Sequence, residues 1–257
     1  MTVSADGGIL RNIRLDISYD GTNFAGWQKQ SASSAARTVQ GELEAALFRL
    51  HKKSIPLIGS GRTDAGVHAA GQVANFHTDI AAMPAERFVP ALNSLLPPDV
   101  RILRAQEVQP GFHARFDARE RTYRYFLDCS VSVPAYELPY CWPLFRRPDV
   151  RRLNSMASVL HGEMDCSVFA AAGDKSFSKS RFFYRAGFFP EGRKLVFQIS
   201  ANAFLWKMVR SILGTILDLE KKGASREDFI RIVKSGRRSL AGQTAPAKGL
   251  FLWNIRY

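Results

Sequence analysis

Cysteine is scarce in this 257-residue chain, and long apolar runs are missing from it. The three cysteines are an odd number without C-x-x-C spacing, which disfavours a disulfide framework or a zinc site and favours reduced thiols. They are Cys129, Cys141 and Cys166. Residues 1–8 lack the apolar core of a signal peptide, and no segment is apolar over the length needed to cross a bilayer. We therefore expect a cytoplasmic protein without a membrane span.

Basic residues outnumber acidic residues in the chain. There are 36 Lys and Arg against 23 Asp and Glu, which gives a net charge of +13 and an isoelectric point near 10.0. Such a chain attracts polyanions through long-range steering and counterion release. Nucleic acid is the first candidate partner and an anionic membrane surface the second, and charge alone does not choose between them. Hydrophobic residues make up 46% of the chain, so an ordinary globular core can form.

Both halves of the sequence show a similar order of strand-type alternation and helix-type periodicity of apolar residues. In the first half we expect strands at 12–19 and 72–77, a loop at 21–26, a helix with its N-cap at Thr38, and a helix opened by Pro84 and ended by residues 97–98. In the second half we expect strands at 122–127, 182–189, 195–201 and 249–257, a helix at 149–161 closed by Gly162, a core helix near 204–222, and a capping box of Ser225 and Asp228. Each half is roughly β-α-β-α-β, which predicts an α+β fold with helices on a mostly antiparallel sheet. The weakest boundary lies near 109–113, so we predict domains at 1–110 and 111–257.

The densest polar segment is 59–68, Gly-Ser-Gly-Arg-Thr-Asp-Ala-Gly-Val-His. Its glycines allow a tight turn and close approach of the backbone to a ligand. The plain interpretation is a surface loop in which Asp64 caps a turn. The segment has no Walker lysine and no G-x-S-x-G elbow, and Asp64 with His68 is a weak pair of metal ligands. What remains is a carboxylate beside an arginine in a basic chain.

Residues 61–68, Gly-Arg-Thr-Asp-Ala-Gly-Val-His, resemble the signature of the TruA-type family of tRNA pseudouridine synthases. Other blocks resemble further elements of that family and follow its order from about residue 12 to residue 257. These blocks are Tyr19-Asp20-Gly21-Thr22 with Phe24, Gly26-Trp27-Gln28, Thr38-Val39-Gln40-Gly41 with Leu43-Glu44, Phe112-His113-Ala114-Arg115-Phe116, Tyr123-Arg124-Tyr125, Asn202-Ala203-Phe204-Leu205, Met208-Val209-Arg210 with Gly214, and Gly249-Leu250. The ordered set is far more specific than any one block.

The resemblance implies two similar subdomains with a joined, mostly antiparallel sheet flanked by helices, and an active site in the cleft between them. The implied reaction detaches uracil from C1′ of its ribose and rejoins it through C5, which requires no redox step, cofactor or metal. The implied substrate is a uridine in the anticodon stem-loop of tRNA, at nucleotides 38, 39 and 40, reached by flipping the base out of its stack. The implied enzyme is a homodimer.

The resemblance also assigns roles to single residues. Asp64 is the implied catalytic carboxylate, which either attacks the sugar or assists formation of an unsaturated sugar. Arg210 is implied to pair with that carboxylate, and Tyr123 to stack on the uracil. Arg62 is implied to fill the gap left by the flipped base and to hold a phosphate, since a planar guanidinium suits both tasks. We also expect Leu250 to pack against the tyrosine.

Plainer interpretations stay open for these side chains on sequence alone. Arg210 could be a cation that reaches from its helix to the surface, and Tyr123 a strand tyrosine packed in the core, as we expect for Tyr125. His68 and His113 are expected to support their motifs or to contact RNA. We expect His77 to be a strand residue with satisfied hydrogen-bond partners.

Two segments depart from the family pattern. Trp206-Lys207 stands where a smaller aromatic residue or a His pair is expected, and residues 31–37 have a composition typical of a flexible loop. Three rival functions stay open: a non-catalytic RNA-binding module, a pseudouridine synthase for another RNA, and a metal-dependent hydrolase that uses Asp64 and His68. A pure binder gains nothing from a carboxylate facing phosphates, and a metal-dependent hydrolase would lose activity to a chelator.

Overall fold

The structure is a computed structural model that describes residues 10–29 and 36–257. The expectations for residues 1–8, and for 31–35 of the predicted loop, lie outside the described residues. No helix in the described ranges is long and apolar enough to cross a membrane.

The chain forms two compact units. Unit 1 comprises Met1–Arg119 and Leu252–Tyr257, and unit 2 comprises Glu120–Phe251. The C-terminal residues therefore return to the unit that contains the N-terminal half of the chain. The predicted domains, 1–110 and 111–257, stay a prediction.

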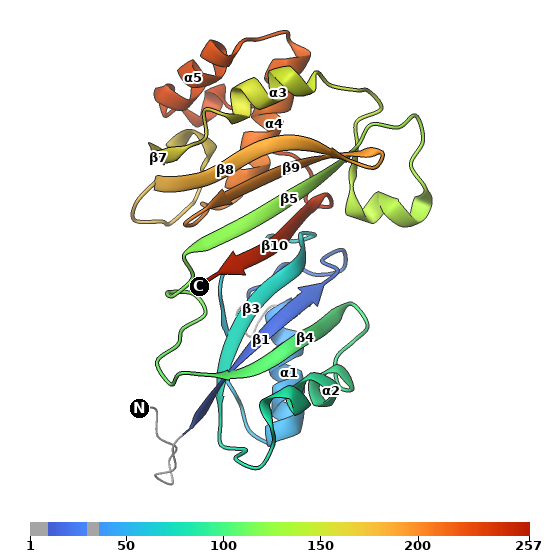
Figure 1. The fold of residues 1–257 in the computed structure, drawn as a ribbon, viewed down its shortest axis with the longest axis vertical. Helices are drawn as coiled ribbons and strands as arrows, with labels where there is room; N and C mark the ends of the chain where they lie inside the picture. The colour runs from blue at the N-terminus through green and yellow to red at the C-terminus, as the bar shows by residue number, and fades with distance from the viewer. Residues whose placement is uncertain (1–9, 30–35) are drawn as a thin grey trace. The chain divides into compact units, whose positions relative to one another are not determined.

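Unit 1 is an antiparallel sheet with helices on one face (Figure 1). Its strands are β1 (Arg11–Tyr19), β2 (Ile58–Gly59), β3 (His68–Thr78), β4 (Val100–Val108) and the later residues of β10 (Leu250–Arg256), in the order β4-β1-β3-β10 with β2 paired to β3. Its helices are α1 (Val39–His51), α2 (Phe88–Asn93) and the short 3-10 turn η1 (Ala85–Arg87). Alternation along β1 buries Ile13, Leu15 and Ile17 completely on one face, which makes that face the core.

Aromatic rings join the layers of unit 1. The His51 ring, at the end of α1, stacks on Phe88 of α2 with 6.3 Å between centroids and meets Phe76 of β3 edge-on at 5.9 Å. Phe76 and Phe88 are fully buried and also contact each other. Both helices are thereby held against the face of the sheet that carries Phe76.

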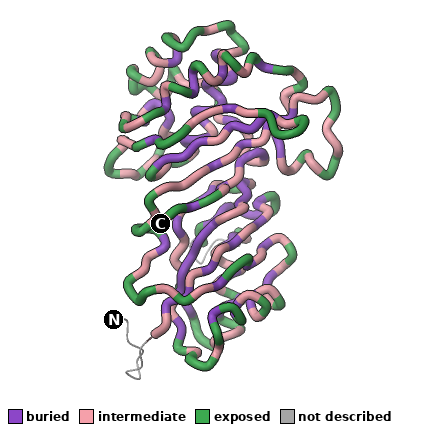
Figure 2. The backbone as a smooth tube through the Cα atoms, viewed as in Figure 1, coloured by how far each residue is buried: buried purple, intermediate pink, exposed green. Residues whose placement is uncertain are grey.

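Unit 2 holds mostly antiparallel strands with three helices gathered on one face (Figure 1). Its strands are β5 (Glu120–Asp128), β6 (Trp142–Pro143), β7 (Gly162–Asp165), β8 (Ser180–Glu191) and β9 (Lys194–Ala201), in the order β5-β9-β8-β7 with β6 paired to β5 in parallel. Its helices are α3 (Val150–Ala157), α4 (Met208–Lys221) and α5 (Arg226–Ser235), with 3-10 turns η2 (Ala135–Tyr140), η3 (Ser167–Phe169) and η4 (Arg238–Leu240). Buried residues follow the strands and α4 (Figure 2), so α4 is the core helix of the unit.

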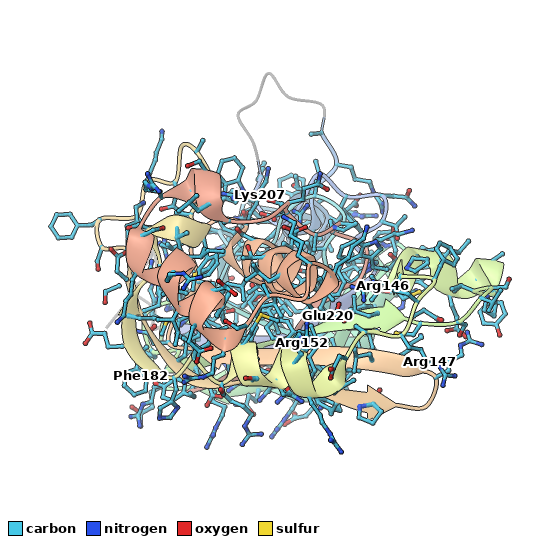
Figure 3. The ribbon with its side chains drawn as sticks, turned by 90° about the horizontal axis from the view of Figure 1, so that it is seen from above. Arg146, Arg147, Arg152, Phe182, Lys207 and Glu220 are labelled. Atoms are coloured by element: carbon cyan, nitrogen blue, oxygen red, sulfur yellow. The ribbon has the colours of Figure 1, made fainter. Side chains whose placement is uncertain are left out.

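Glu220 ties two helices of unit 2 together near the end of α4. Its Oε1 accepts the backbone N–H of Asp149, the N-cap of α3, at 2.9 Å. Its Oε2 pairs with Arg146 at 2.6 Å, and the two side chains lie beside each other in Figure 3. The side chain of Glu220 is only 8% exposed, so this acid is paired where it is buried, as a buried charge requires.

The predicted fold class is confirmed: this is an α+β protein whose mostly antiparallel strands are flanked by helices. Local signals also gave correct elements. Thr38 caps α1 through a hydrogen bond from the N–H of Gly41, and Ser225 and Asp228 form the capping box of α5. The strands predicted at 182–189 and 195–201 are present as β8 and β9, which pair antiparallel. The predicted cleft between the two subdomains stays a prediction.

Three predicted helix boundaries were wrong. Pro84 precedes a 3-10 turn and a six-residue helix that ends at Asn93. The helix after Asp149 ends at Ala157, and Gly162 opens β7. The long core helix begins at Met208 because Lys207 has a φ of +59°, a left-handed conformation that interrupts a right-handed helix.

The middle of α4 is packed against the chain that leads into β10. A Cβ on Gly214 would lie 1.8 Å from the carbonyl oxygen of Gln243, and a Cβ on Gly242 would lie 2.9 Å from the Cα of Thr215. The Oγ1 of Thr215 accepts the N–H of Gly242 at 2.9 Å. Segment 241–249 is therefore fixed on α4 by backbone contacts that leave no room for larger residues.

We predict that Gly214→Ala destabilises the protein although alanine is the better helix former. The added methyl group must displace backbone, so the free energy of unfolding should fall by about 3 kcal/mol or more. Urea denaturation measures this change. Gly111→Ala is the matched control, because a Cβ built there meets no described residue within 4 Å other than its chain neighbours. Equal stability of the two variants would contradict the close packing of α4 on segment 241–249.

Candidate functional site

Unit 1 holds Asp64 on the segment 59–68, called the Asp64 loop below, between β2 and β3. The loop is tied to β3 at its start. Gly59 pairs with Ala74, and the N–H of Ser60 donates to the carbonyl of Val73 at 2.8 Å. A Cβ on Gly59 would lie 2.6 Å from the indole of Trp27, which is buried. The loop therefore starts from a position fixed on both sides.

The side chain of Gln72 holds the next residues of the loop. Its Oε1 accepts from the hydroxyl of Ser60 at 2.6 Å, and its Nε2 donates to the carbonyl of Gly61 at 3.0 Å. Gln72 and Ser60 are both buried. Because buried polar groups are costly unless they are paired, this network favours a single loop conformation.

Thr63, next to Asp64, is held by two contacts from other segments. Its Oγ1 lies 2.8 Å from the hydroxyl of Tyr19 at the end of β1, and its carbonyl accepts the N–H of Trp27 at 3.1 Å. Burial raises the pKa of Tyr19 far above its usual value, and the hydrogen bond to Thr63 offsets only part of that rise, so the phenol stays neutral.

Two glycines let another backbone segment pack directly on the loop. Gly26 has a φ of +103°, and a Cβ there would lie 2.7 Å from the carbonyl oxygen of Thr63. A Cβ on Gly21 would lie 2.0 Å from the carbonyl oxygen of Val67. Side chains at either position would push the loop away. Gly21 and Gly26 thus allow the close packing that positions the Asp64 loop.

Asp64 begins a tight turn at the exposed end of this packing. Its carbonyl accepts the N–H of Val67 at 3.2 Å, and Gly66 takes a φ of +75° inside the turn. Asp64 is half-buried, whereas Arg62 is exposed. The arrangement presents a carboxylate from a rigid backbone, with a guanidinium two residues before it on the surface.

His68 supports the loop from beneath. It is completely buried, and its Nδ1 lies 3.0 Å from the backbone nitrogen of Gly21 and 3.2 Å from Oδ1 of Asp20. A backbone N–H only donates, so Nδ1 accepts here and the ring proton is on Nε2. The contact with Asp20 is therefore not an ion pair. No group of three or more His, Cys, Asp or Glu side chains that could hold a metal ion occurs among the described residues.

The other histidines differ in part from expectation. Nδ1 of His113 accepts from the backbone of Arg115 and Phe116 at 3.2 and 3.3 Å, which is a motif-supporting role. His77 is a strand residue, but the expectation of satisfied partners was wrong, because its buried Nε2 has no hydrogen-bond partner among the residues that the structure describes.

Cys129, Cys141 and Cys166 are free thiols. Burial raises the pKa of all three, to about 12 for Cys166, so these thiols stay protonated. None of them is poised as a nucleophile.

Unit 2 holds Tyr123 on β5, opposite Ile199 of β9. The tyrosine is 9% exposed, and its ring meets Phe204 edge-on at 5.1 Å. Tyr125, two residues on, shares its face and is fully buried, as predicted. Tyr123 is therefore at the rim of the same core in which Tyr125 is enclosed.

Arg210 lies in the first turn of α4 and is held by the segment before β10. Its Nε donates to the carbonyl of Ala245 at 2.7 Å, and its own carbonyl accepts the N–H of Ala245 at 3.1 Å. The hydroxyl of Tyr125 donates to the next carbonyl, that of Pro246, at 2.8 Å. Burial raises the pKa of Tyr125, and the charge of Arg210 opposes that rise. Arg210 is thus fixed in place instead of reaching freely to the surface.

Leu250 completes this part of unit 2. It is buried, and its N–H donates to the carbonyl of Ala247 at 2.9 Å. The preceding Gly249 accepts the N–H of Phe126, and a Cβ there would lie 2.6 Å from the Tyr125 ring. The chain from Ala245 to Leu250 therefore links α4 to β5.

The predicted site residues fall into two groups. Asp64 and Arg62 belong to unit 1, while Tyr123, Arg210 and Leu250 belong to unit 2. Their joint action in one site stays a prediction. The sequence interpretation missed the residues that position Asp64, of which Tyr19 and Gln72 are the clearest. The sequence shows Tyr19 as the last residue of an alternating strand pattern. No local pattern indicates that its hydroxyl is hydrogen-bonded to Thr63.

Comparison with known proteins identifies the family. The family model described as tRNA pseudouridine synthase matches residues 17–117 and 156–257. The tRNA pseudouridine synthase A of Treponema denticola is 58% identical over 96% of this chain and 93% of its own length. The corresponding proteins of Borreliella afzelii and Bacillus subtilis are each 40% identical, over 96% and 95% of this chain and 100% and 98% of their own lengths. The matches place the chain among RNA-modifying isomerases. The chain belongs to the tRNA pseudouridine synthase family.

We predict that Tyr19 and Thr63 are coupled in stability and turnover. Tyr19→Phe or Thr63→Val alone breaks a buried hydrogen bond and should lower the free energy of unfolding by about 1 to 2 kcal/mol, with a parallel loss of turnover. The double variant should lose less than the sum of the two. Urea denaturation and single-turnover isomerisation measure both effects, with Tyr136→Phe as an exposed control. Strict additivity would show that the two hydroxyls do not interact.

We predict a loss of stability at alkaline pH. The pKa values of Tyr19 and Tyr125 are raised by burial, so the folded state keeps protons that the unfolded chain releases. Their stabilisation is complete below about pH 10, the usual tyrosine pKa, and falls as pH rises above it. Urea midpoints from about pH 8 to pH 11 should show the decline, and the double variant Tyr19→Phe with Tyr125→Phe should show a shallower one. A parallel decline in the variant would rule out this origin.

Proposed function

We propose that this chain converts uridine to pseudouridine in tRNA, with Asp64 as its catalytic carboxylate. The observation that carries the proposal is the near-complete match to tRNA pseudouridine synthase A proteins, which spans 96% of the chain at 58% identity. The chain is accordingly an isomerase that acts on tRNA. The rigid Asp64 loop supports the choice of carboxylate, because catalysis needs a group held in one position.

The reaction is balanced without any outside reagent. The bond between C1′ and N1 of the uridine breaks, a bond between C1′ and C5 forms, C5 loses a proton and N1 gains one. Asp64 is proposed to act at C1′, either by direct attack or by removing a sugar proton to give an unsaturated sugar. Both routes use the same carboxylate and leave it unchanged at the end.

Arg210 is proposed to pair with Asp64. The hydrogen bond from Nε to the carbonyl of Ala245 fixes the plane of the guanidinium. A guanidinium with a fixed plane can meet a carboxylate through its Nη groups with good geometry. The family resemblance suggests the partner, and the fixed orientation in unit 2 supports the role.

Tyr123, Leu250 and Arg62 are proposed to hold the substrate. Tyr123 has a ring that is largely buried and braced by Phe204, which suits a flat apolar contact with an extruded uracil. Leu250 is buried at the start of β10 and is proposed to pack against that ring. Arg62 is exposed beside Asp64, and it is proposed to occupy the space left by the flipped base and to contact a phosphate.

The finer assignments follow the family resemblance. The target uridines are proposed to be nucleotides 38, 39 and 40 in the anticodon stem-loop, reached by base flipping. The active enzyme is proposed to be a cytoplasmic homodimer that uses no cofactor. The net charge of +13 supports a polyanionic substrate.

A non-catalytic RNA-binding module is the rival from another class. It would not benefit from a rigidly presented carboxylate in a basic chain, since a negative group weakens binding to phosphates. A pseudouridine synthase for another RNA differs only in substrate and is separated by mapping the product. A metal-dependent hydrolase would need more ligands than Asp64, because Nδ1 of His68 is occupied by the N–H of Gly21.

We predict that Asp64→Ala and Asp64→Asn abolish turnover while tRNA binding persists. Unmodified tRNA transcripts incubated with each protein are mapped for pseudouridine at single-nucleotide resolution, with and without a chelator. Turnover should fall at least about a thousandfold, the dissociation constant should stay within about threefold, and the chelator should change nothing. Modification should appear at nucleotides 38, 39 and 40.

The matched control is Asp79→Ala, which removes a carboxylate that pairs with Lys53 and is 44% exposed. It should retain wild-type turnover. Isomerisation by the Asp64 variants would overturn the proposed mechanism. Modification of another RNA, with tRNA left untouched, would overturn the proposed substrate.

A further inference from the structure

The loop between η3 and β8, residues 171–179, is organised around the carboxylate of Asp174. Its side chain is 5% exposed and accepts from Nζ of Lys179 at 2.5 Å and from the backbone N–H of Ser176 at 2.9 Å. Burial alone would raise the pKa of Asp174, but these hydrogen bonds and one from the N–H of Trp206 hold it far below its usual value. The carboxylate therefore stays charged and keeps the loop closed on itself.

The same carboxylate attaches this loop to the residues before α4. Oδ2 of Asp174 accepts the N–H of Trp206 at 2.8 Å, and the carbonyl of Trp206 accepts the N–H of Ala171 at 3.2 Å. The indole lies 3.9 Å from where a Cβ on Gly173 would be. Lys207, labelled at the start of α4 in Figure 3, takes its left-handed conformation at this junction. Two segments distant in sequence are thus locked together.

This locked pair presents aromatic rings to solvent. Trp206 is 47% exposed, and Phe177 is fully exposed. Nζ of Lys207 lies 4.7 Å from the centroid of the Trp206 ring, and Lys175 is exposed on the loop. We call Phe177, Trp206, Lys175 and Lys207 the Trp206 shelf. A large aromatic side chain exposed on a fixed backbone is costly to leave in water, so it is expected to have a partner.

The shelf is connected to Tyr123 through two residues of chain. Phe204, which braces the Tyr123 ring at 5.1 Å, precedes Trp206 by two positions, and Arg210 follows Trp206 by four. Any group stacked on Trp206 is therefore close to the part of unit 2 proposed to receive the uracil.

Charge indicates the chemistry of the partner. Asp174 is the only acidic residue in segment 171–179, and its charge is used internally by Lys179 and two backbone N–H groups. The cations at the surface of the shelf are Lys175 and Lys207. Aromatic faces flanked by ammonium groups match nucleobases and phosphates of a single-stranded nucleic acid, since every base has a π-face and every linkage a negative charge.

We propose that the Trp206 shelf stacks an unpaired base of the tRNA substrate beside the target uridine. The proposal rests on the proposed function and extends it, because it gives a role to the dipeptide Trp206-Lys207 that departs from the family pattern. The contact is to the face of the base and to its phosphate, so it does not depend on which base is present. It holds the strand in place while the target uridine leaves its stack.

The test compares tRNA binding and turnover of shelf variants. Trp206→Ala and Phe177→Ala should each weaken binding of an unmodified tRNA transcript roughly tenfold, and Trp206→Phe should stay within about threefold. At saturating tRNA each variant should turn over at close to the wild-type rate, so the loss should appear in KM. Phe177 is fully exposed, so replacing it with alanine should not destabilise the fold. Phe177→Ala therefore keeps the test valid if Trp206→Ala is unstable.

Salt dependence separates stacking from charge. Trp206→Ala should keep the wild-type slope of log affinity against log salt, whereas Lys175→Ala with Lys207→Ala should reduce that slope by about 1 to 2. Quenching of tryptophan fluorescence by oligouridylate should be lost in Trp206→Phe. Tyr136→Ala removes an aromatic ring that is 75% exposed on η2 and is the matched control, with wild-type behaviour expected.

The outcomes separate the two proposals. If the wild-type protein forms no pseudouridine in tRNA, the proposed function fails whatever the shelf does. If the wild-type protein is active and both aromatic variants bind tRNA as tightly as wild type, the shelf proposal fails alone. A change of oligomeric state in Trp206→Ala, with tRNA affinity unchanged, would make the shelf a contact between copies of the chain and would also overturn the proposal.

Discussion

The position of Asp64 depends on the close approach of two backbone segments. Gly21 and Gly26 bring the chain after β1 so near to Thr63 and Val67 that no side chain could fit between them. Hydrogen bonds from Tyr19, Trp27 and Gln72 then fix what the contact has brought together. A carboxylate on an ordinary surface loop would sample many positions, and each would have to be restricted when substrate binds. Here the restriction is already present in the fold.

Unit 2 follows the same principle with different groups. Two consecutive carbonyls, those of Ala245 and Pro246, accept from Arg210 and Tyr125. The segment that carries these carbonyls is itself fixed on α4, since Gly214 leaves no space between α4 and Gln243. Backbone acceptors cannot move without the segment, so a guanidinium bound to one keeps its direction. In both units, the groups proposed for catalysis are placed by backbone that glycine allows to pack closely.

The sequence predicted the elements whose signals are local. Apolar alternation gave β1, and the caps at Thr38 and Ser225 gave the starts of α1 and α5. The start of α4 could not be found in this way. Its apolar pattern extends back to Phe204, but α4 begins only at Met208, because Lys207 is left-handed next to Trp206, whose N–H is bound by Asp174, 32 residues earlier. Tyr19 and Thr63 are 44 residues apart, so their contact also has no local signal. Asp64 itself was singled out only by the family resemblance, because a carboxylate in a glycine-rich loop has many ordinary explanations.

The proposed site combines a rigidly held carboxylate, Asp64, with the Trp206 shelf, which is proposed to bind RNA without regard to base identity. The proposed targets are adjacent nucleotides in different tRNAs, so the neighbouring bases would differ from one target to the next. Hydrogen bonds to base edges would favour one neighbour over the others, whereas stacking on an aromatic ring and pairing with a phosphate tolerate all of them. Trp206 and Lys207 offer those two contacts, on a junction fixed by Asp174. The proposed role of these two residues therefore separates from the proposed chemistry at Asp64, because it concerns only how firmly the flanking strand is held. The proposed reaction requires a precisely placed carboxylate where the bond to C1′ is exchanged. The contact to the neighbouring nucleotide is required only to accept any base.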